Sequence, residues 1–299
     1  MSILVDKNTK VIIQGITGRE GSLRTAYMKG YGTNVVAGVT PGRGGDEVHG
    51  IPVFDTVKEA IKSVGTVDAS VTFVPGPGLK AAVYEAVDSG VKFVVSPVER
   101  IPTQDVIKMV NYALKKGTKL IGPGSLGLIS PGKAVLGWLG GSVDWANKLF
   151  EPGPIGVISR SGGQSGTVPW ALKVAGLGIS TALHIGTEPV LGLSMVDALK
   201  EFEKDDQTKG VAVFGEIGGT LEEEAAEAVV KREYTKPLVV FIAGAWAPEG
   251  MQFSHASSIV ERGKGSAKSK ITALTQAGAT VVDSPEQIAT EMKKLLGIK

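Results

Sequence analysis

The chain has 299 residues, of which 42% are hydrophobic and 21% charged, a balance typical of a globular protein long enough for two domains. Its formal net charge of +2 argues against nucleic acid or an anionic membrane surface as a partner. It contains no cysteine, which excludes disulfides, thiolate metal ligands and cysteine nucleophiles, and no other pattern indicates a metal site.

The first half of the chain alternates short, β-branched apolar runs with amphipathic segments. Two of these segments, 78–89 and 103–116, have a helical pattern. Continuous apolar strands between helices indicate a parallel sheet that is covered on both faces. The expected strands are 10–14, 34–39, 69–74, 91–96 and 118–121.

This alternation of apolar runs and amphipathic segments stops at 123–153, where a stretch rich in Gly and Pro precedes a Trp-containing segment. We interpret this part as the connection between two domains. The alternation then resumes, which predicts two tandem α/β domains with doubly wound parallel sheets: a Rossmann-like domain over 1–122 and a flavodoxin-like domain over 154–299. The strands expected in the second domain are 154–159, 179–185, 210–215, 237–242 and 279–282.

Ligands of such sheets bind beyond the carboxyl ends of the strands. The first strand ends in a glycine-rich turn that opens a helix, Gln14-Gly15-Ile16-Thr17-Gly18-Arg19-Glu20-Gly21. Glycines allow backbone N–H groups to approach a phosphate closely, and a helix N-terminus adds favourable partial charge. The same turn is also found where a helix merely packs on a strand.

The loop after the second expected strand narrows the choice of nucleotide. A dinucleotide enzyme usually places Asp or Glu about 20 residues beyond the glycines, where it binds a ribose 2′-hydroxyl. Here the loop offers Arg43, in Thr40-Pro41-Gly42-Arg43-Gly44-Gly45. A cation suits a phosphorylated ribose, in CoA or in NADP, although a solvated turn with one surface arginine is the alternative. Two further strand ends would flank the same crevice, Phe73-Val74-Pro75 and Ser96-Pro97-Val98-Glu99.

Three features of the second domain follow expected strands. Strand 154–159 leads into a turn rich in Gly and Ser, Ser159-Arg160-Ser161-Gly162-Gly163-Gln164-Ser165-Gly166, which is not a Walker loop. Glu216 lies between glycines at the end of strand 210–215, and His255 lies in the loop after strand 237–242. A helix N-terminus is expected at 161–163, where it would hold an anion.

These three features share the chemistry of phosphoryl relay. A neutral imidazole is a good nucleophile toward phosphorus, and a carboxylate on its other nitrogen fixes the tautomer and stabilises the developing charge. The anion site at 161–163 would neutralise the attached phosphate. A lone histidine is more often a surface or core residue, which is how we interpret His49 and His184.

With these residues assembled, the chain resembles the alpha subunit of succinyl-CoA synthetase over nearly its whole length. The motifs stand in the family's order: MSILVDKNTKVIIQGITGREG, VTPGRGG, GPGSLGLISPG, GVISRSGG, GEIGG and the loop around His255. The resemblance implies that His255 is phosphorylated transiently and that Glu216 orients it. The phosphate would then bind at Ser161, Gly162 and Gly163, the anion site inferred above. The resemblance implies a CoA site made of Gly15, Thr17, Gly18, Arg19, Glu20, Gly21, Arg43, Phe73, Val74, Pro75, Ser96 and Glu99.

The resemblance also implies a partner. A beta subunit with an ATP-grasp domain would phosphorylate the histidine, using ATP or GTP with Mg²⁺, in a heterodimer or a dimer of heterodimers. The reaction class is acid + CoA + NTP ⇌ acyl-CoA + NDP + phosphate, through an acyl phosphate. Succinate is the first expectation for the acid.

Several departures from the family surround the acid site. Arg43 replaces the usual lysine, which keeps the charge but changes the hydrogen-bonding geometry. Gly124-Ser125 replaces Asn-Cys, Gly186-Thr187-Glu188-Pro189 replaces Gly-Gly-Asp-Pro, and 253–258 is less rich in glycine. Three other parts resemble ATP-citrate lyase and citryl-CoA synthetase more than the succinate enzymes: the turn at 161–163, Gln252-Phe253 and the longer 138–153 segment. Citrate or another hydroxy acid is therefore the alternative substrate.

Two hypotheses from other classes stay open. An NADP-dependent oxidoreductase would use the first domain but leave the features of the second domain unexplained. A non-catalytic CoA-binding protein would leave His255 without a role. The N-terminal residues lack the apolar core of a signal peptide, and no apolar run approaches the roughly 20 residues of a membrane span, so a cytoplasmic location is expected.

Overall fold

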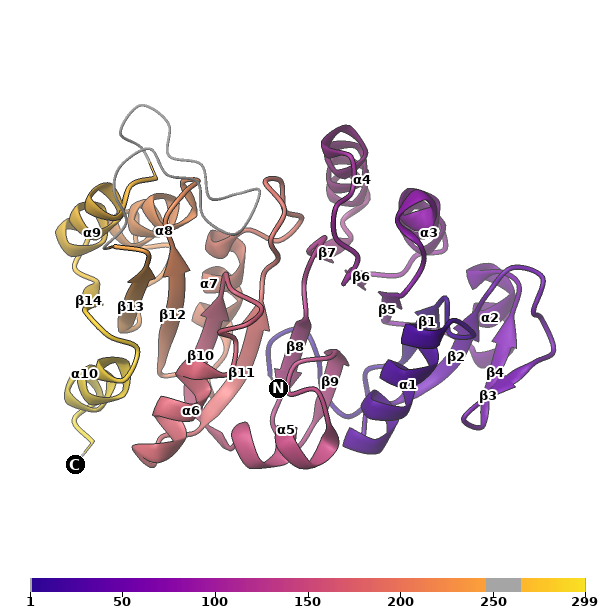
Figure 1. Ribbon diagram of the computed structural model, residues 1–299, viewed down its shortest axis with the longest axis horizontal. Helices are drawn as coiled ribbons and strands as arrows, with labels where there is room; N and C mark the ends of the chain where they lie inside the picture. The colour runs from indigo at the N-terminus through magenta and orange to yellow at the C-terminus, as the bar shows by residue number, and fades with distance from the viewer. Residues whose placement is uncertain (1, 246–264, 299) are drawn as a thin grey trace. The chain divides into compact units, whose positions relative to one another are not determined.

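The structure is a computed structural model that describes residues 2–245 and 265–298 (Figure 1). The chain divides into two compact units. The first unit comprises Leu4–Ala146 and Val190–Leu193, and the second comprises Met1–Ile3, Asn147–Pro189 and Ser194–Lys299. Each unit has a largely parallel sheet with packed helices, so the expected pair of doubly wound α/β folds is confirmed.

The first unit contains a seven-stranded sheet made of β1 (Val11–Gln14), β2 (Val35–Val39), β3 (Glu47–Val48), β4 (Ile51–Phe54), β5 (Ala69–Thr72), β6 (Phe93–Val95) and β7 (Lys119–Ile121). Their order across the sheet is β3-β4-β2-β1-β5-β6-β7. Neighbours pair in parallel except β3 and β4, which form an antiparallel hairpin at one edge. All four residues of β1 are buried, as in a central strand covered on both faces.

Four helices pack on this sheet: α1 (Arg19–Tyr31), α2 (Val57–Val64), α3 (Gly76–Asp88) and α4 (Thr103–Lys116). Helices α2, α3 and α4 share one core with alternate strand residues, among them Ile12, Val94 and Leu120. Helix α4 buries a single stripe and ends at Gly117, which adopts the left-handed conformation that favours glycine. The helical pattern predicted for 103–116 is therefore confirmed.

The segment between the expected domains forms an antiparallel hairpin of β8 (Gly127–Ser130) and β9 (Ala134–Gly137). A Cβ at Gly127 would lie 1.8 Å from the carbonyl oxygen of Leu136, so only glycine fits this close approach. Thr33 joins the hairpin to the end of α1, because its Oγ1 donates to Val135 O at 2.7 Å. The chain then enters the second unit within α5 (Val143–Leu149).

The second unit contains the parallel strands β10 (Pro152–Ser159), β11 (Ile179–His184), β12 (Gly210–Glu216), β13 (Leu238–Ala243) and β14 (Thr280–Val282). They lie in the order β14-β13-β12-β10-β11. All ten strands predicted from the apolar runs are present in the two units, each with its ends within two residues of the expected ones. Because the strands of this unit are parallel, the ends of β10, β12 and β13 meet at one edge of the sheet.

The helices of the second unit are α6 (Thr167–Val174), α7 (Met195–Lys204), α8 (Leu221–Val230), α9 (Ala267–Gln276) and α10 (Gln287–Leu296). Helix α8 packs between α7 and α9, and α10 packs on α6 (Figure 1). Phe202 of α7 is fully buried and lies directly over Gly156 of β10. Helix α8 follows β12 after a short turn, so its N-terminus lies at the carboxyl edge of the sheet.

Candidate functional site

The turn between β1 and α1 is packed so closely that two of its positions require glycine. A Cβ at Gly15, whose φ is +85°, would lie 2.4 Å from the carbonyl oxygen of Phe73. A Cβ at Gly21 would lie 2.0 Å from the carbonyl oxygen of Gly15. The structure thus brings two expected CoA-binding segments together, the 15–21 turn and the end of β5 with 73–75.

The same turn is joined to the end of β2. The Gly15 N–H donates to Val39 O at 2.7 Å, and Thr17 Oγ1 donates to Thr40 Oγ1 at 3.2 Å. Helix α1 begins after Gly18, and no described side chain caps it. Its first N–H groups can therefore bind an anion. The next residues, Arg19 and Glu20, are exposed to solvent.

Arg43 lies in the loop after β2, and 57% of its side chain is exposed. Its guanidinium forms an ion pair with Asp46 at 2.6 Å. Asp55 Oδ1 accepts a hydrogen bond of 2.9 Å from the Gly44 N–H and so fixes the same loop. An exposed guanidinium with one carboxylate partner can exchange that partner for a phosphate.

Ser96 and Glu99 follow β6, which neighbours β5 in the sheet. Ser96 is fully buried, and its Oγ has no hydrogen-bond partner among the described residues. Its carbonyl oxygen accepts from the Ser125 N–H at 3.1 Å, so this strand end contacts one of the segments that depart from the family pattern. Glu99 is exposed. Among the described residues, the first unit thus offers a glycine-rich turn (the glycine cradle), a helix start without a side-chain cap, the loop cation Arg43 and the Ser96 hydroxyl without a hydrogen-bond partner. Such groups fit a ligand with phosphate and polar groups, such as CoA.

In the second unit, Ser161, Gly162 and Gly163 do not begin a helix, because α6 begins four residues after Gly163, at Thr167. Ser159 Oγ donates to Ser161 O at 2.8 Å, and a second hydroxyl, that of Ser165, donates to Gly162 O at 2.8 Å. These hydroxyls close successive turns and thereby delay the helix. The expectation of a helix N-terminus at 161–163 is wrong. Ser161 is buried, whereas Gly163 is exposed.

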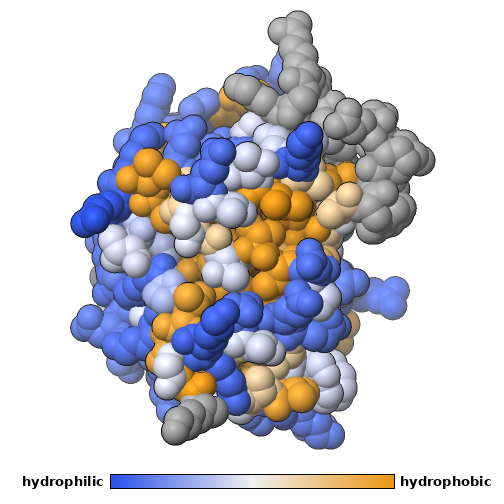
Figure 2. All heavy atoms as spheres, turned by 90° about the vertical axis from the view of Figure 1, so that its left-hand side faces the viewer, coloured by the Kyte–Doolittle hydropathy of each residue, from blue (hydrophilic) through white to orange (hydrophobic). Residues whose placement is uncertain are grey.

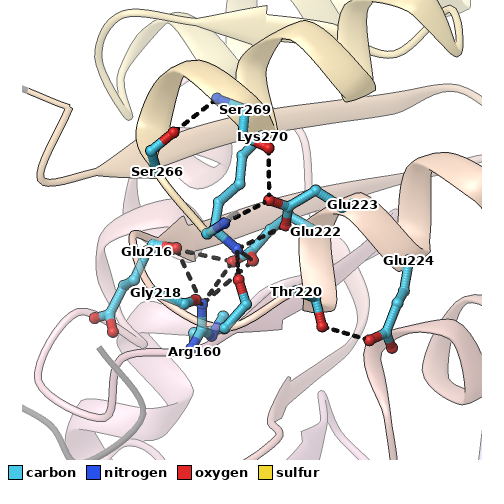
Figure 3. A network of polar contacts seen from close by, with 12 residues as sticks. Arg160, Glu216, Gly218, Thr220, Glu222, Glu223, Glu224, Ser266, Ser269 and Lys270 are labelled. Carbon is cyan, nitrogen blue, oxygen red and sulfur yellow. Dashed lines mark hydrogen bonds and ion pairs between the residues drawn. The ribbon is translucent and has the colours of Figure 1, made fainter. Parts of the chain in front are cut away.

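Glu216 is the last residue of β12 and begins the 216–219 turn, which leads into α8. Gly218 and Gly219 both have positive φ values, +85° and +61°. The backbone of Glu216 contacts Arg160 and Glu222, whereas its carboxylate points away from them (Figure 3). The carboxylate is therefore presented beyond the end of the sheet.

Glu216 lines a cavity of about 730 Å³. Gln164, from the turn before α6, lines the same cavity, as do residues at the ends of β13 and β14. Most of the lining is apolar, with Ile217, Phe241 and Ile271 among its side chains. Figure 2, which faces the part of the second unit that carries β14, shows apolar side chains gathered there. The structure thus places the acid at a strand end and the glycine-rich turn on one cavity.

His255 lies outside the described residues. The described residues on either side of its segment both contact the 216–219 turn. At the end of β13, Ala243 O accepts from the Ile217 N–H at 3.2 Å. Gly265 is the first described residue after the segment, and its carbonyl oxygen accepts from the Gly218 N–H at 2.7 Å. The segment that includes His255 therefore leaves and rejoins the described chain beside the turn that begins with Glu216.

A buried charge cluster, which consists of Arg160, Glu222 and Lys270, lies behind this turn (Figure 3). Arg160 Nη1 lies 3.1 Å from Glu222 Oε1, and Lys270 also contacts Glu222. The side chains of Glu222 and Lys270 are 0% exposed. Burial alone would raise the pKa of Glu222, but the charges of Arg160 and Lys270 and the hydrogen bond from Lys270 outweigh it and hold that pKa below its usual value.

Sequence reasoning missed this cluster. Glu222 stands in a run of three glutamates at the start of a helix, a pattern typical of a solvated N-terminus. Lys270 stands in a polar stretch of α9. Neither position carries a signal of burial. The interpretation of His184 as a core residue is confirmed, since it is 1% exposed and its Nε2 lies 3.2 Å from Arg160 O.

Comparison with known proteins agrees with this arrangement. Residues 6–100 match the family model of a CoA binding domain, and residues 158–280 match that of CoA-ligase. The chain is 47% identical to the alpha subunit of an ADP-forming succinate–CoA ligase of Aquifex aeolicus, over 100% of this chain and 96% of that one. It is 41% identical to a subunit of an ADP-forming sulfoacetate–CoA ligase of Acholeplasma sp, over 99% of this chain and 98% of that one.

A solved structure extends the comparison. ATP citrate lyase of Methanosaeta concilii, in complex with (3S)-citryl-CoA, superposes with a TM-score of 0.90 at 25% identity. The match covers 99% of this chain and 50% of the lyase chain, so this chain spans about half the length of that protein. Among the described residues, none of the helices combines the length and apolar character of a membrane span. The chain belongs to the family of the alpha subunits of ADP-forming succinate–CoA ligases and related acid–CoA ligases.

Proposed function

We propose that this acid–CoA ligase subunit carries a phosphoryl group on His255, between a nucleotide and the acid. The observation that carries the proposal is that described residues on both sides of the His255 segment, Ala243 and Gly265, accept hydrogen bonds from the turn that begins with Glu216. A carboxylate at a strand end beside the two ends of a segment with one histidine is suited to orienting an imidazole.

The reaction proceeds in three transfers. An imidazole nitrogen of His255 attacks the γ-phosphorus of the nucleotide, and the bond to the β–γ bridging oxygen breaks, which releases NDP. A carboxylate oxygen of the acid then attacks the phosphorus, and the bond to the imidazole nitrogen breaks, which gives an acyl phosphate. The CoA thiolate finally attacks the acyl carbon and releases phosphate. The sum is acid + CoA + NTP ⇌ acyl-CoA + NDP + phosphate.

Each end of this relay has a candidate site in the second unit. Glu216 holds the imidazole in one tautomer and stabilises the positive charge that develops as the ring is phosphorylated. Ser161, Gly162 and Gly163 bind the phosphate as a turn rather than as a helix N-terminus. The donors are the N–H groups of Gly162 and Gly163, because the Ser161 N–H donates to Ser159 Oγ at 3.2 Å. Gln164 supports this assignment, because it continues this turn into the cavity that Glu216 lines.

CoA binds the first unit in this proposal. The glycine cradle and the uncapped start of α1 receive phosphate, and Arg43 pairs with the phosphorylated ribose in exchange for Asp46. The buried hydroxyl of Ser96 supplies a polar contact near the end of β6. The proposed contacts are those of the expected site: Gly15, Thr17, Gly18, Arg19, Glu20, Gly21, Arg43, Phe73, Val74, Pro75, Ser96 and Glu99.

A partner subunit completes the enzyme. The name of the Aquifex aeolicus relative identifies that protein as a subunit alpha, which supports a beta partner here as well. We propose that this partner carries an ATP-grasp domain and binds ATP or GTP with Mg²⁺. The same proposal divides the chain into a CoA-binding domain over 1–122, a connection over 123–153 and a ligase domain over 154–299. It also includes a cytoplasmic location and assembly as a heterodimer or a dimer of heterodimers.

Succinate is the acid that we propose. Support comes from the relatives named as succinate–CoA ligase subunits, one of which is 47% identical to this chain. A sulfoacetate–CoA ligase subunit at 41% identity favours a sulfonated acid as second candidate, and the solved lyase with citryl-CoA favours citrate. Initial rates with succinate, sulfoacetate, malate and citrate in the reconstituted enzyme discriminate among them. A preference for any acid other than succinate would refute this part of the proposal.

Labelled nucleotide tests the relay. The chain and its cognate large subunit are incubated with ATP or GTP labelled at the γ-phosphate. We expect a label on this chain that is lost in acid, survives in base and is absent from His255→Asn. A Glu216→Gln variant should be labelled more slowly while it binds CoA normally. Normal labelling of His255→Asn would overturn the assignment.

A further inference from the structure

The buried charge cluster has no part in the relay described above, yet it makes four hydrogen bonds to the backbone of the 216–219 turn. Arg160 Nη1 donates to the carbonyl oxygens of Glu216 at 3.0 Å and of Gly218 at 2.9 Å. Glu222 Oε1 accepts from the Glu216 N–H at 3.1 Å. Lys270 Nζ donates to Gly219 O at 3.0 Å. Both polar groups of the Glu216 backbone are thus held by buried charges.

The cluster also reaches the point where the described chain resumes. Lys270 Nζ lies 3.0 Å from Glu223 Oε2. The other oxygen of Glu223 accepts from the Gly265 N–H at 3.0 Å and from Ser269 Oγ at 3.1 Å. One connected set of charges therefore fixes the turn that begins with Glu216 and the residue at which the His255 segment rejoins the described chain.

Stability is a poor explanation for such a cluster. Together with Glu223, which also pairs with Lys270, the cluster holds two cations and two carboxylates that balance one another. Removing such charges from water costs free energy that their mutual attraction often fails to recover. Well-packed apolar side chains of similar volume usually stabilise a fold as well or better. What charged groups provide and apolar groups do not is directional hydrogen bonding to specific peptide groups.

We propose that Glu222 and Lys270 are positioning residues for phosphoryl transfer to His255. They hold the 216–219 turn rigidly, so that the Glu216 carboxylate is presented in one place beyond the sheet, and they fix Gly265 relative to it. The proposal rests on the proposed function for its chemistry. Its structural half, the rigidity of the turn, concerns described residues alone and is tested separately.

The principal variant is Lys270→Met, which keeps the length of the side chain and removes the donor to Gly219 O. The matched control is Asp205→Asn. Like Lys270, Asp205 is a buried charged residue, and its carboxylate accepts a hydrogen bond of 2.6 Å from Thr208 Oγ1. It precedes β12 and so lies at the end of that strand opposite to Glu216. Both changes remove one buried charge from the same unit, and only Lys270→Met removes a bond to the 216–219 turn.

Amide hydrogen exchange of the full chain provides the first measurement. The N–H groups of residues 217–219 and of Gly265 should exchange at least about tenfold faster in Lys270→Met, while those of β12 and β13 keep their protection. Asp205→Asn should leave residues 217–219 unchanged. Unchanged exchange at the turn in Lys270→Met would overturn the proposal, whether or not His255 is phosphorylated.

Single-turnover phosphorylation in the complex with the large subunit provides the second measurement. Lys270→Met should slow labelling of His255 by about tenfold to a hundredfold, the loss expected when a reacting group is misplaced by about 1 Å, with the Kd for CoA unchanged. Asp205→Asn should be labelled at the wild-type rate. Absence of label from the wild-type chain would refute the proposed function and leave the exchange measurement to decide the structural half.

A double variant separates positioning from stability. Glu222→Gln combined with Lys270→Met removes one charge of each sign, so the cluster is again balanced and the midpoint of urea unfolding should recover toward the wild-type value. Gly219 O still lacks its donor, so the labelling rate should stay low. If rate and stability recovered together, the cluster would have a structural role only, and the proposal would be wrong.

Discussion

Replacing Gly15 with alanine tests the cradle on which the proposed CoA site depends. Gly15 has a φ of +85°, and an added Cβ would lie 2.4 Å from the carbonyl oxygen of Phe73. Gly90 has nearly the same φ, +83°, but an added Cβ there would meet no described atom within 4 Å. Gly90→Ala therefore has the backbone strain of Gly15→Ala without the collision.

The two penalties can be estimated separately. A left-handed alanine costs about 1–2 kcal/mol, which both variants share. An ordinary contact of a Cβ begins near 3.4 Å. The turn at Gly15 or the strand end at Phe73 must therefore move by roughly 1 Å, and such overpacking adds about 1–3 kcal/mol. Because both segments belong to the proposed CoA site, the movement should also weaken CoA binding by about a hundredfold, whereas Gly90→Ala should bind CoA normally.

Urea unfolding and calorimetric titration with CoA measure the two effects. We expect Gly15→Ala to lose more unfolding free energy than Gly90→Ala. We also expect that only Gly15→Ala loses CoA affinity. Equal destabilisation of the two variants would show that the close approach to Phe73 is relieved without cost. Normal CoA binding by a destabilised Gly15→Ala would show that the turn does not form the cradle.

Three further predictions concern single contacts. Arg43→Ala should weaken CoA binding by about tenfold, since a charge-assisted bond is lost, and Asp46→Asn should strengthen it because it releases Arg43; titration that shows no opposition between the two would contradict the exchange of partners. The ionised form of Glu222, whose pKa is lowered from 4.5, stabilises the fold above that pH, and this stability is lost as pH falls through the lowered pKa. Below about pH 4.5, the unfolding free energy measured in urea should therefore fall more steeply with pH in the wild type than in Glu222→Gln, and equal slopes of free energy against pH would contradict this role. Gly156→Ala, whose Cβ would lie 2.6 Å from the ring of Phe202, should cost about 1–3 kcal/mol in thermal unfolding and be partly rescued by Phe202→Leu, and an unchanged Tm would refute this packing.

The apolar runs predicted the central strands of both units because a strand buried on both faces must be apolar throughout. The short strands β3, β4, β8 and β9 were missed, since runs of two to four residues between Gly and Pro show no period. The late start of α6 was missed for a related reason. Ser159 and Ser165 bond to the local backbone in turns, and a glycine-rich pattern does not distinguish such turns from a helix N-terminus.

The candidate site divides in the same way. Arg43 and Glu216 were predicted as site residues from their positions after strands, because the parallel strands of each unit bring their carboxyl ends to one edge of that unit's sheet. Glu222 and Lys270 were not recognised: they are 48 positions apart, and each stands among polar residues that look solvated. Whether a charged side chain is buried, and which charge it meets, depends on the elements that pack around it. Local pattern could therefore predict the layers of this protein, while the charges behind the 216–219 turn were decided only when α8 and α9 packed beside the ends of β10 and β12.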